Sequence, residues 1–96
     1  MEFEWDAGKS ERTRAARGFN FSFAKRVFDD PRRIDRPDLR RDYGEDRRQT
    51  IGDIDGEIYF VVYTPRGGVV RIISARRAHD NEKRAYGATL GEIPGG

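Results

Sequence analysis

Three apolar segments separated by short turns dominate the C-terminal half of the chain. Residues 49–54, 57–64 and 69–75 are rich in β-branched and aromatic side chains, and the connections between them are Asp55-Gly56 and Pro65-Arg66-Gly67-Gly68. Glycine-containing connections between such segments are typical of hairpin turns. The pattern therefore predicts three antiparallel strands that follow one another as a meander.

The middle predicted strand is apolar on both of its faces. Side chains alternate along a strand, so one face carries Ile58, Phe60 and Val62 and the other carries Tyr59, Val61 and Tyr63. We expect this strand at the centre of the sheet. It is either covered on both faces, or covered on one face while the other offers a ligand surface.

Two weaker strand patterns precede the meander. Phe3 and Trp5 alternate with glutamates, which predicts a short half-buried strand. Residues 32–48 contain almost no apolar side chains and predict a long charged loop with a weak strand near 33–36. Pro37 restricts that strand to the edge of a sheet, because proline cannot donate a ladder hydrogen bond.

Helical patterns lie between these two strands. The first predicts a helix over residues 7–17, with Asp6 as its N-cap and Gly18 as its end. The second predicts a helix over residues 23–28, with Ser22 as its N-cap and an Asp-Asp-Pro sequence that stops it.

The chain ends with a predicted helix over 78–86 and a glycine-rich tail over 87–96 that we expect to be flexible. The order of these elements predicts one α+β domain over 1–86, in which helices pack on an antiparallel sheet.

Charge is abundant and unevenly distributed. Of the 96 residues, 38% are charged, and 16 of the 19 basic residues are arginine, the side chain best suited to forked contacts with phosphate or carboxylate. Residues 29–57 have a net charge of −3 and residues 58–96 a net charge of +3. These charges either form solvated surface and internal ion pairs, or mark a basic region that meets a polyanion or an acidic partner.

The composition excludes several classes of protein. The chain has no cysteine, which excludes a disulfide scaffold and thiolate chemistry and suits a reducing cytoplasm. The first ten residues lack the pattern of a signal peptide, and no apolar run approaches the roughly 20 residues of a membrane helix. We expect a cytoplasmic protein without a membrane partner.

Arginines interrupt the last predicted strand. Simple alternation places Arg71 and Arg76 on opposite faces, so we do not expect them to form one patch. Each either pairs with a carboxylate of the acidic 29–57 segment, or at least one of them, with Arg66 of the adjacent turn, holds a phosphate.

Sequence motifs for metal or cofactor chemistry are missing. There is no Cys/His metal spacing, no glycine-rich phosphate loop before a helix and no serine nucleophile elbow, so we expect neither a metal nor a cofactor. His79 is the single histidine and is either a surface or capping residue or a catalytic one. The groups left for catalysis are Lys, Arg, Tyr and Glu, which suit proton transfer and charge stabilisation during RNA cleavage.

Several segments together resemble the BrnT family of type II toxins. They are FEWDAGK at 3–9, FSFAKRVFDDP at 21–31, GEDRRQTIG at 44–52, VVYTPRG at 61–67, RIISARRA at 71–78 and NEKRAY at 81–86. The resemblance covers about residues 2–86. It implies a RelE-like fold, with an antiparallel sheet of about four strands, two N-terminal helices and one C-terminal helix.

The resemblance also implies an activity and partners. It implies an endoribonuclease that inhibits translation by cutting RNA in the cytoplasm. The residue types listed above would do this chemistry without a metal. Its antitoxin would be BrnA-like with a ribbon-helix-helix domain, and two toxins would flank an antitoxin dimer. Promoter DNA would be bound only through the antitoxin.

Carried over by position, the resemblance implies the site residues. The matching positions are Lys9, Glu45, Arg66 and Arg76, which we expect to be catalytic, and Arg47, which we expect to bind substrate. We add three further candidates for substrate binding on other grounds: Tyr63 is close to Arg66 in sequence, Arg17 keeps a positive charge, and His79 could replace a missing histidine. One departure matters, because the family commonly has Lys-His-Gly where this chain has Ala16-Arg17-Gly18. Arginine cannot act as a base near neutral pH. An alternative is therefore a weakened or inactive homologue that only binds RNA or antitoxin, with the arginines serving the antitoxin interface.

Overall fold

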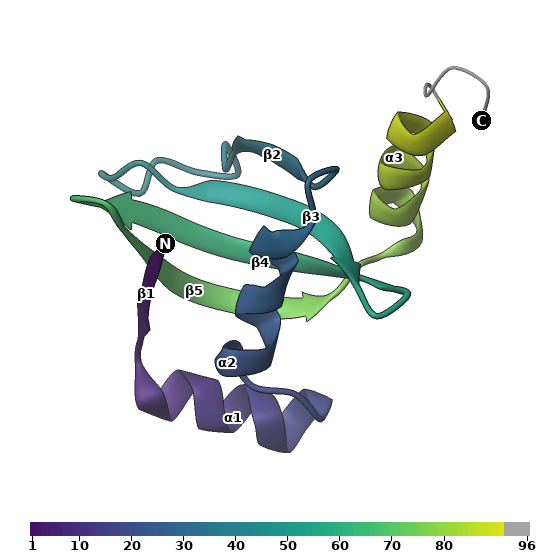
Figure 1. Cartoon of the computed structure of the whole chain (residues 1–96). Coiled ribbons are helices and arrows are strands. Elements are labelled where there is room, and N and C mark those ends of the chain that lie inside the picture. Colours follow the sequence, from purple (N-terminus) through teal and green to yellow (C-terminus); the bar gives the residue numbers. More distant parts are fainter. Residues whose placement is uncertain (92–96) are drawn as a thin grey trace.

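The computed structural model of the chain describes residues 1–91, with side chains described through residue 88. Its elements in chain order are β1 (Glu2–Trp5), α1 (Ala7–Arg17), α2 (Phe21–Ala24), the 3-10 helix η1 (Lys25–Asp29), β2 (Ile34–Pro37), β3 (Arg48–Ile54), β4 (Glu57–Arg66), β5 (Val69–Arg77) and α3 (Asp80–Gly91). The strands form one sheet in the order β1-β5-β4-β3-β2 (Figure 1).

The predicted α+β class, the antiparallel meander and the weak edge strand are confirmed, but the predicted sheet was one strand too small. The sheet has five strands and is mixed, because β1 pairs in parallel with residues 69–72 of β5. Phe3 and Trp5 anchor β1 by packing against the core. The strand patterns themselves number five, and the count of about four came from the resemblance. A four-residue pattern indicates a strand but does not reveal which edge of the sheet it joins or in which direction, so the parallel pairing of β1 was not predicted.

The helix ends follow local capping. Asp6 caps α1 by accepting the Lys9 N–H at 2.8 Å, and Gly18 ends it in the left-handed conformation with φ of 85°, as predicted. The predicted Ser22 cap of the second helix is wrong. Asn20 caps α2 instead, because its side chain accepts the Phe23 N–H at 2.9 Å.

The N-terminal helices cover one face of the sheet. The larger core lies between them and the sheet and contains Phe19, Phe21, Ala24, Val27, Ile54, Tyr59, Val61, Tyr63, Val70, Ile72 and Ala75. Gly52 lets η1 approach β3 closely, since a Cβ at this position would lie 2.7 Å from Cγ2 of Val27. We call this side the helix face.

The opposite side, which we call the open face, is covered less. A smaller core of Ile51, Phe60, Val62 and Tyr86 lies there, where α3 meets the sheet. Tyr86 donates a hydrogen bond to Asp30 and so fastens α3 beside β3. The prediction that β4 is central and apolar on both faces is confirmed.

A β-bulge corrects the predicted arrangement of the arginines on β5. Val62 pairs with Ser74 and Tyr63 with Ile72, so Ile73 is an extra residue on β5. An extra residue reverses the alternation beyond it. Arg71, opposite Thr64, and Arg76, opposite Phe60, therefore lie on the same open face rather than on opposite faces.

The last helix is longer than predicted. It begins at Asp80 and continues to Gly91, into the segment expected to be a flexible tail; the remaining residues of that tail, 92–96, lie outside the described residues. No helix in the described part of the chain has the length and apolar character needed to cross a membrane.

Candidate functional site

A cavity opens where α1 runs beside the outer edge of β5. Because β1 pairs with β5 only up to Ile72, the rest of that edge faces α1 instead of a strand (Figure 1). The cavity has a volume of about 510 Å³. It is lined by Lys9, Arg12, Thr13, Ala16, Arg17, Phe21, Arg47, Ile73, Ser74 and Ala75.

The lining of this cavity is strongly cationic. Lys9, Arg12, Arg17 and Arg47 contribute four positive charges, and no carboxylate is among the lining residues. Like charges gathered at one cavity repel each other unless an anion is present. The cavity therefore suits an anionic ligand such as a phosphate.

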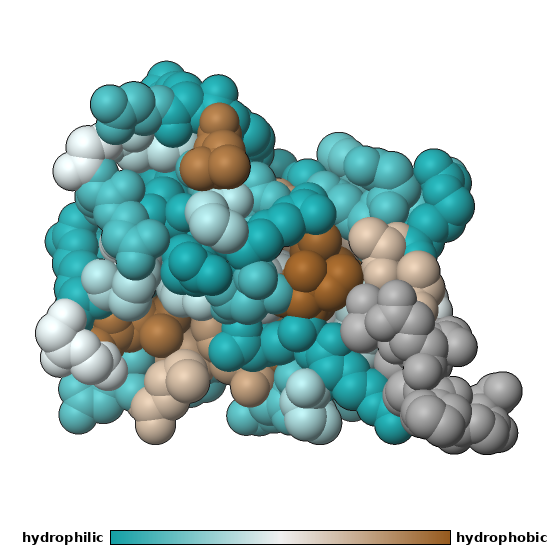
Figure 2. Space-filling model, turned by 90° about the horizontal axis from the view of Figure 1, so that it is seen from above, coloured by the Kyte–Doolittle hydropathy of each residue, from teal (hydrophilic) through white to brown (hydrophobic). Residues whose placement is uncertain are grey.

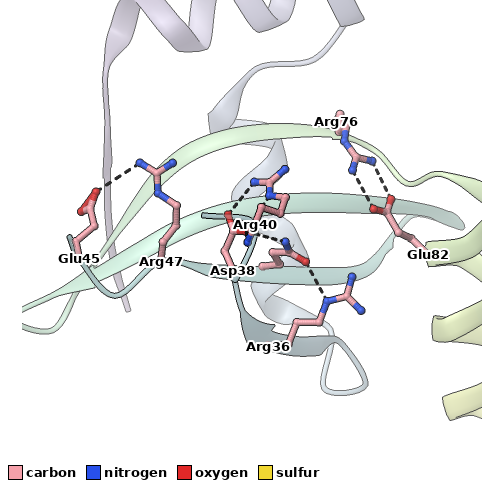
Figure 3. Close-up of polar contacts among 8 residues, drawn as sticks. Arg36, Asp38, Arg40, Glu45, Arg47, Arg76 and Glu82 are labelled. Atoms are coloured by element: carbon pink, nitrogen blue, oxygen red, sulfur yellow. Dashed lines mark hydrogen bonds and ion pairs between the residues drawn. The ribbon is translucent and has the colours of Figure 1, made fainter. Parts of the chain in front are cut away.

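Arg47 is the most constrained cation of the cavity. Its guanidinium lies 3.9 Å from the centre of the Tyr43 ring and 3.4 Å from Glu45 (Figure 3). Its Nε is buried and has no hydrogen-bond acceptor within the described residues. A buried donor without a partner is rare in native proteins and calls for an explanation. A ligand oxygen in the adjoining cavity would satisfy it.

Glu45 links Arg47 to the hairpin turn of the meander. Its carboxylate lies 3.4 Å from Arg47 and 3.3 Å from Arg66. Hydrogen bonding from Arg66, aided by Arg47 and opposed by desolvation, lowers the pKa of Glu45. A carboxylate with a lowered pKa is a weaker proton acceptor, so this geometry suits Glu45 to orienting the two arginines.

Arg76 lies farther along the open face and is held by its own carboxylate. It donates two hydrogen bonds to Glu82, of 2.8 and 2.9 Å, and lies 4.0 Å from the centre of the Phe60 ring (Figure 3). Burial opposes ionisation of Glu82, but hydrogen bonds from Arg76 and from the His79 N–H outweigh it and lower the pKa of Glu82. Arg76 is thus fixed between β5 and α3.

Three of the predicted site residues, Lys9, Arg17 and Arg47, meet at the cavity, and Glu45 and Arg66 adjoin it through Arg47. Sequence reasoning missed Arg12, Thr13 and Ser74. A signal existed for Arg12, which lies three residues after Lys9 on the same side of α1. Ser74 could not be placed, because its position depends on the bulge.

The structure places Tyr63 and His79, two of the predicted site residues, away from the cavity. Tyr63 is buried in the core of the helix face, where its hydroxyl donates to Asp35. His79 precedes α3, and its backbone N–H donates to Glu82 at 2.7 Å, a contact typical of a capping position. Neither lines the cavity.

Comparison with known proteins supplies the family. A family model described as the ribonuclease toxin, BrnT, of type II toxin–antitoxin systems matches residues 5–82. The chain belongs to the BrnT family. The match contains every lining residue of the cavity as well as Glu45, Arg66, Arg76 and Glu82. A search of curated proteins gave no match.

Membership in the BrnT family confirms the resemblance seen in the sequence. It makes this chain a ribonuclease toxin of a type II toxin–antitoxin system, with RNA as substrate and an antitoxin as partner.

Proposed function

We propose that this BrnT-family chain cleaves RNA at the cationic cavity, by attack of a ribose 2′-hydroxyl on the adjacent phosphate and without a metal ion. The observation that carries this proposal is the convergence of Lys9, Arg12, Arg17 and Arg47 on one cavity without a lining carboxylate. Such a lining attracts a phosphate and repels a metal cation.

The reaction needs charge stabilisation and two proton transfers. The 2′-oxygen forms a bond to phosphorus while the bond from phosphorus to the 5′-oxygen breaks, leaving a cyclic phosphate and a 5′-hydroxyl. The 2′-hydroxyl loses one proton to solvent, and the departing 5′-oxygen gains one from a general acid. Donors aimed at the phosphorane oxygens lower the barrier, because negative charge grows there in the transition state.

The arrangement of the side chains suggests their roles. Arg47, with its unsatisfied buried Nε, is the best-placed donor to a phosphorane oxygen, and Arg12 and Arg17 add charge. Lys9 is the cavity cation able to deliver a proton to the 5′-oxygen, because arginine stays protonated. Glu45 and Arg66 keep Arg47 in position.

The setting of this activity follows from the family resemblance. We propose a RelE-like fold, inhibition of translation in the cytoplasm, and a BrnA-like ribbon-helix-helix antitoxin that joins two toxins through its dimer and carries the complex to promoter DNA. The cationic lining of the cavity would be complemented by an acidic antitoxin segment, which supports an antitoxin that covers it.

The test is cleavage of labelled RNA by the purified protein in EDTA. The proposal predicts fragments with cyclic phosphate ends, and a large loss of cleavage in Lys9→Met without loss of folding. Arg14→Met, which removes a cation from the same helix outside the cavity lining, is the matched control. Strict dependence on added metal, or equal rates in both variants, would refute the proposed mechanism.

A second candidate is a toxin homologue that binds RNA without cutting it. Ala16 and Arg17 stand where the resemblance leads us to expect lysine and histidine, and both line the cavity. The missing histidine falls at the site itself, while His79 lies at the start of α3 and does not line the cavity. RNA binding without cleavage in the same assay would favour this candidate.

A further inference from the structure

A second group of arginines lies on the open face, beyond the cavity. These arginines are Arg36 and Arg40. Together with Asp38 and Gln49, to which they are hydrogen-bonded, they form what we call the outer strip. Figure 3 shows its arginines on the same side of the sheet as Arg47 and Arg76. Arg40 lies 5.8 Å and Arg76 4.0 Å from the centre of the same Phe60 ring.

The outer strip is held together by one hydrogen-bonded chain. Arg36 donates from Nε to Gln49 at 2.9 Å, Gln49 donates to Asp38 at 3.0 Å, and Arg40 donates to both carboxylate oxygens of Asp38 at 2.8 and 2.7 Å. Fixed guanidinium groups lose little freedom when a ligand binds, so they are prepared for recognition.

The arginines of the outer strip are exposed to solvent, whereas its single carboxylate is buried. The Asp38 side chain is 0% exposed, whereas that of Arg40 is 54% exposed and Arg36 is exposed as well. Residues 36–41 carry three arginines and one aspartate. A polyanion approaching this surface therefore meets positive charge, and the surface over β2 is largely hydrophilic (Figure 2).

The loop before β3 joins the strip to the cavity. Tyr43 lies under the Arg47 guanidinium at 3.9 Å, and it adds to the effect of Asp38 in raising the pKa of Arg40. The same loop carries Leu39, whose 84% exposure is unusual for a large apolar residue here. Guanidinium planes, an aromatic ring and an exposed apolar side chain are surfaces on which unpaired bases stack.

We propose that the outer strip binds the phosphates of single-stranded RNA next to the nucleotides held in the cavity. The substrate is then a single strand several nucleotides longer than the cleaved step. This inference rests on the proposed function, because it takes the cavity as the cleavage site.

The experiment compares binding of short and long RNA. The probes are 2′-O-methyl oligonucleotides of about 4 and about 12 nucleotides, the span that single-strand binding folds cover, because they lack the attacking hydroxyl. Arg36→Gln and Arg40→Gln are compared with Arg26→Gln. Arg26 is the matched control, since it is a half-exposed arginine paired with Asp55 and lies outside the strip.

Both strip variants should bind the longer probe about tenfold more weakly, as expected for one lost charge-assisted hydrogen bond, and bind the shorter one normally. Each should also lower the slope of log affinity against log salt by about 0.7. Arg36→Gln leaves the Asp38–Arg40 pair intact, and thermal melts confirm folding.

The proposal that the outer strip binds RNA would be refuted by an equal loss of affinity for both probes or by no loss of affinity for either. Weaker antitoxin binding with unchanged RNA binding would also refute it. A long duplex that competes as well as the single strand would also overturn it. Cleavage of short RNA by the unmodified protein and its loss in Lys9→Met report on the cavity separately. The strip can therefore fail while the proposed function stands.

Discussion

Arg76 and Glu82 form a two-hydrogen-bond ion pair that joins the end of β5 to the first turn of α3. The Glu82 side chain is only 8% exposed and also accepts the His79 N–H. Arg76 therefore supports the fold and at the same time presents a cation on the open face. The two roles can be separated by changing one partner at a time.

Arg76→Ala and Glu82→Gln should differ in activity more than in stability. Each breaks a largely buried pair and should cost about 2–4 kcal/mol of unfolding free energy. If Arg76 also binds RNA phosphate, Arg76→Ala relieves growth arrest, whereas Glu82→Gln stays toxic at temperatures where it is folded. Chemical denaturation and growth assays measure the two effects. Equal toxicity of the two folded variants would leave Arg76 with a structural role alone.

Arg47→Met should lose activity without losing stability. The substitution keeps a long side chain beside Tyr43 but removes a buried Nε that has no acceptor. Such a donor costs about 1–3 kcal/mol, which offsets the loss of the long contact with Glu45. We expect an unchanged or higher melting temperature and cleavage lower by about 100-fold or more. A lower melting temperature together with normal cleavage would contradict this.

The sequence predicted the elements well where a pattern is local. Alternation within β4 placed its apolar residues on two faces, and capping residues placed the ends of α1, because both depend on neighbours in the chain. The bulge on β5 arises from the way β4 and β5 pair. It could not be predicted from the alternation within β5 alone. For this reason Arg71 and Arg76 were placed on opposite faces.

The candidate site likewise contains residues that the sequence could identify and residues that it could not. Family position brought in Lys9 and Arg47, retained positive charge brought in Arg17, and the structure places all three at the cavity. Tyr63 was included because it is close to Arg66 in sequence, yet alternation turns its side chain to the helix face. Arg40 was not identified, because its role depends on a buried aspartate beneath it.

Acid should destabilise the protein partly through Asp38. Hydrogen bonding from Arg40, opposed by desolvation, lowers the pKa of Asp38 from 3.8 to about 2. Because folding lowers this pKa, the stabilisation is complete above pH 3.8 and is lost as the pH falls through about 2. It amounts to about 1–2 kcal/mol after screening at half-exposed Arg40.

The measurement is unfolding free energy as a function of pH. Asp38→Asn should be less stable near neutral pH and should show a flatter loss between about pH 4 and pH 2. Asp42→Asn removes an exposed carboxylate from the same loop and is the matched control. If both variants keep the full acid dependence of the unmodified protein, Asp38 is not its source.

Gly52→Ala should loosen the contact between η1 and the sheet. The new Cβ would lie 2.7 Å from Cγ2 of Val27 and 3.0 Å from Cβ of Arg33, so backbone must move, at a cost of about 1–3 kcal/mol. Gly87→Ala is the contrasting variant. It has open space around its Cβ position in α3 and should gain up to about 1 kcal/mol from helix propensity. Urea unfolding compares them, and equal stabilities would refute the close approach.

Tyr63→Phe should lower the stability of the protein but leave RNA cleavage nearly unchanged. The Tyr63 hydroxyl donates to Asp35, which also accepts hydrogen bonds from Arg33 and Arg48. Removing the hydroxyl leaves this part-buried carboxylate with one donor fewer and should cost about 1–2 kcal/mol. The ring and its packing on Phe28 remain, so the strand keeps its place. Because the hydroxyl lies on the helix face, RNA cleavage should stay within about twofold of the unmodified rate.

Cleavage kinetics and urea unfolding of the same Tyr63→Phe preparation decide between the two roles. Tyr59→Phe is a suitable control, since Tyr59 is buried in the same core and lies four residues before Tyr63 on the same face of β4. A large loss of cleavage in Tyr63→Phe but not in Tyr59→Phe would mean that the hydroxyl reaches the substrate. Loss of stability with normal cleavage would instead place Tyr63 among the residues that hold β2 against β4.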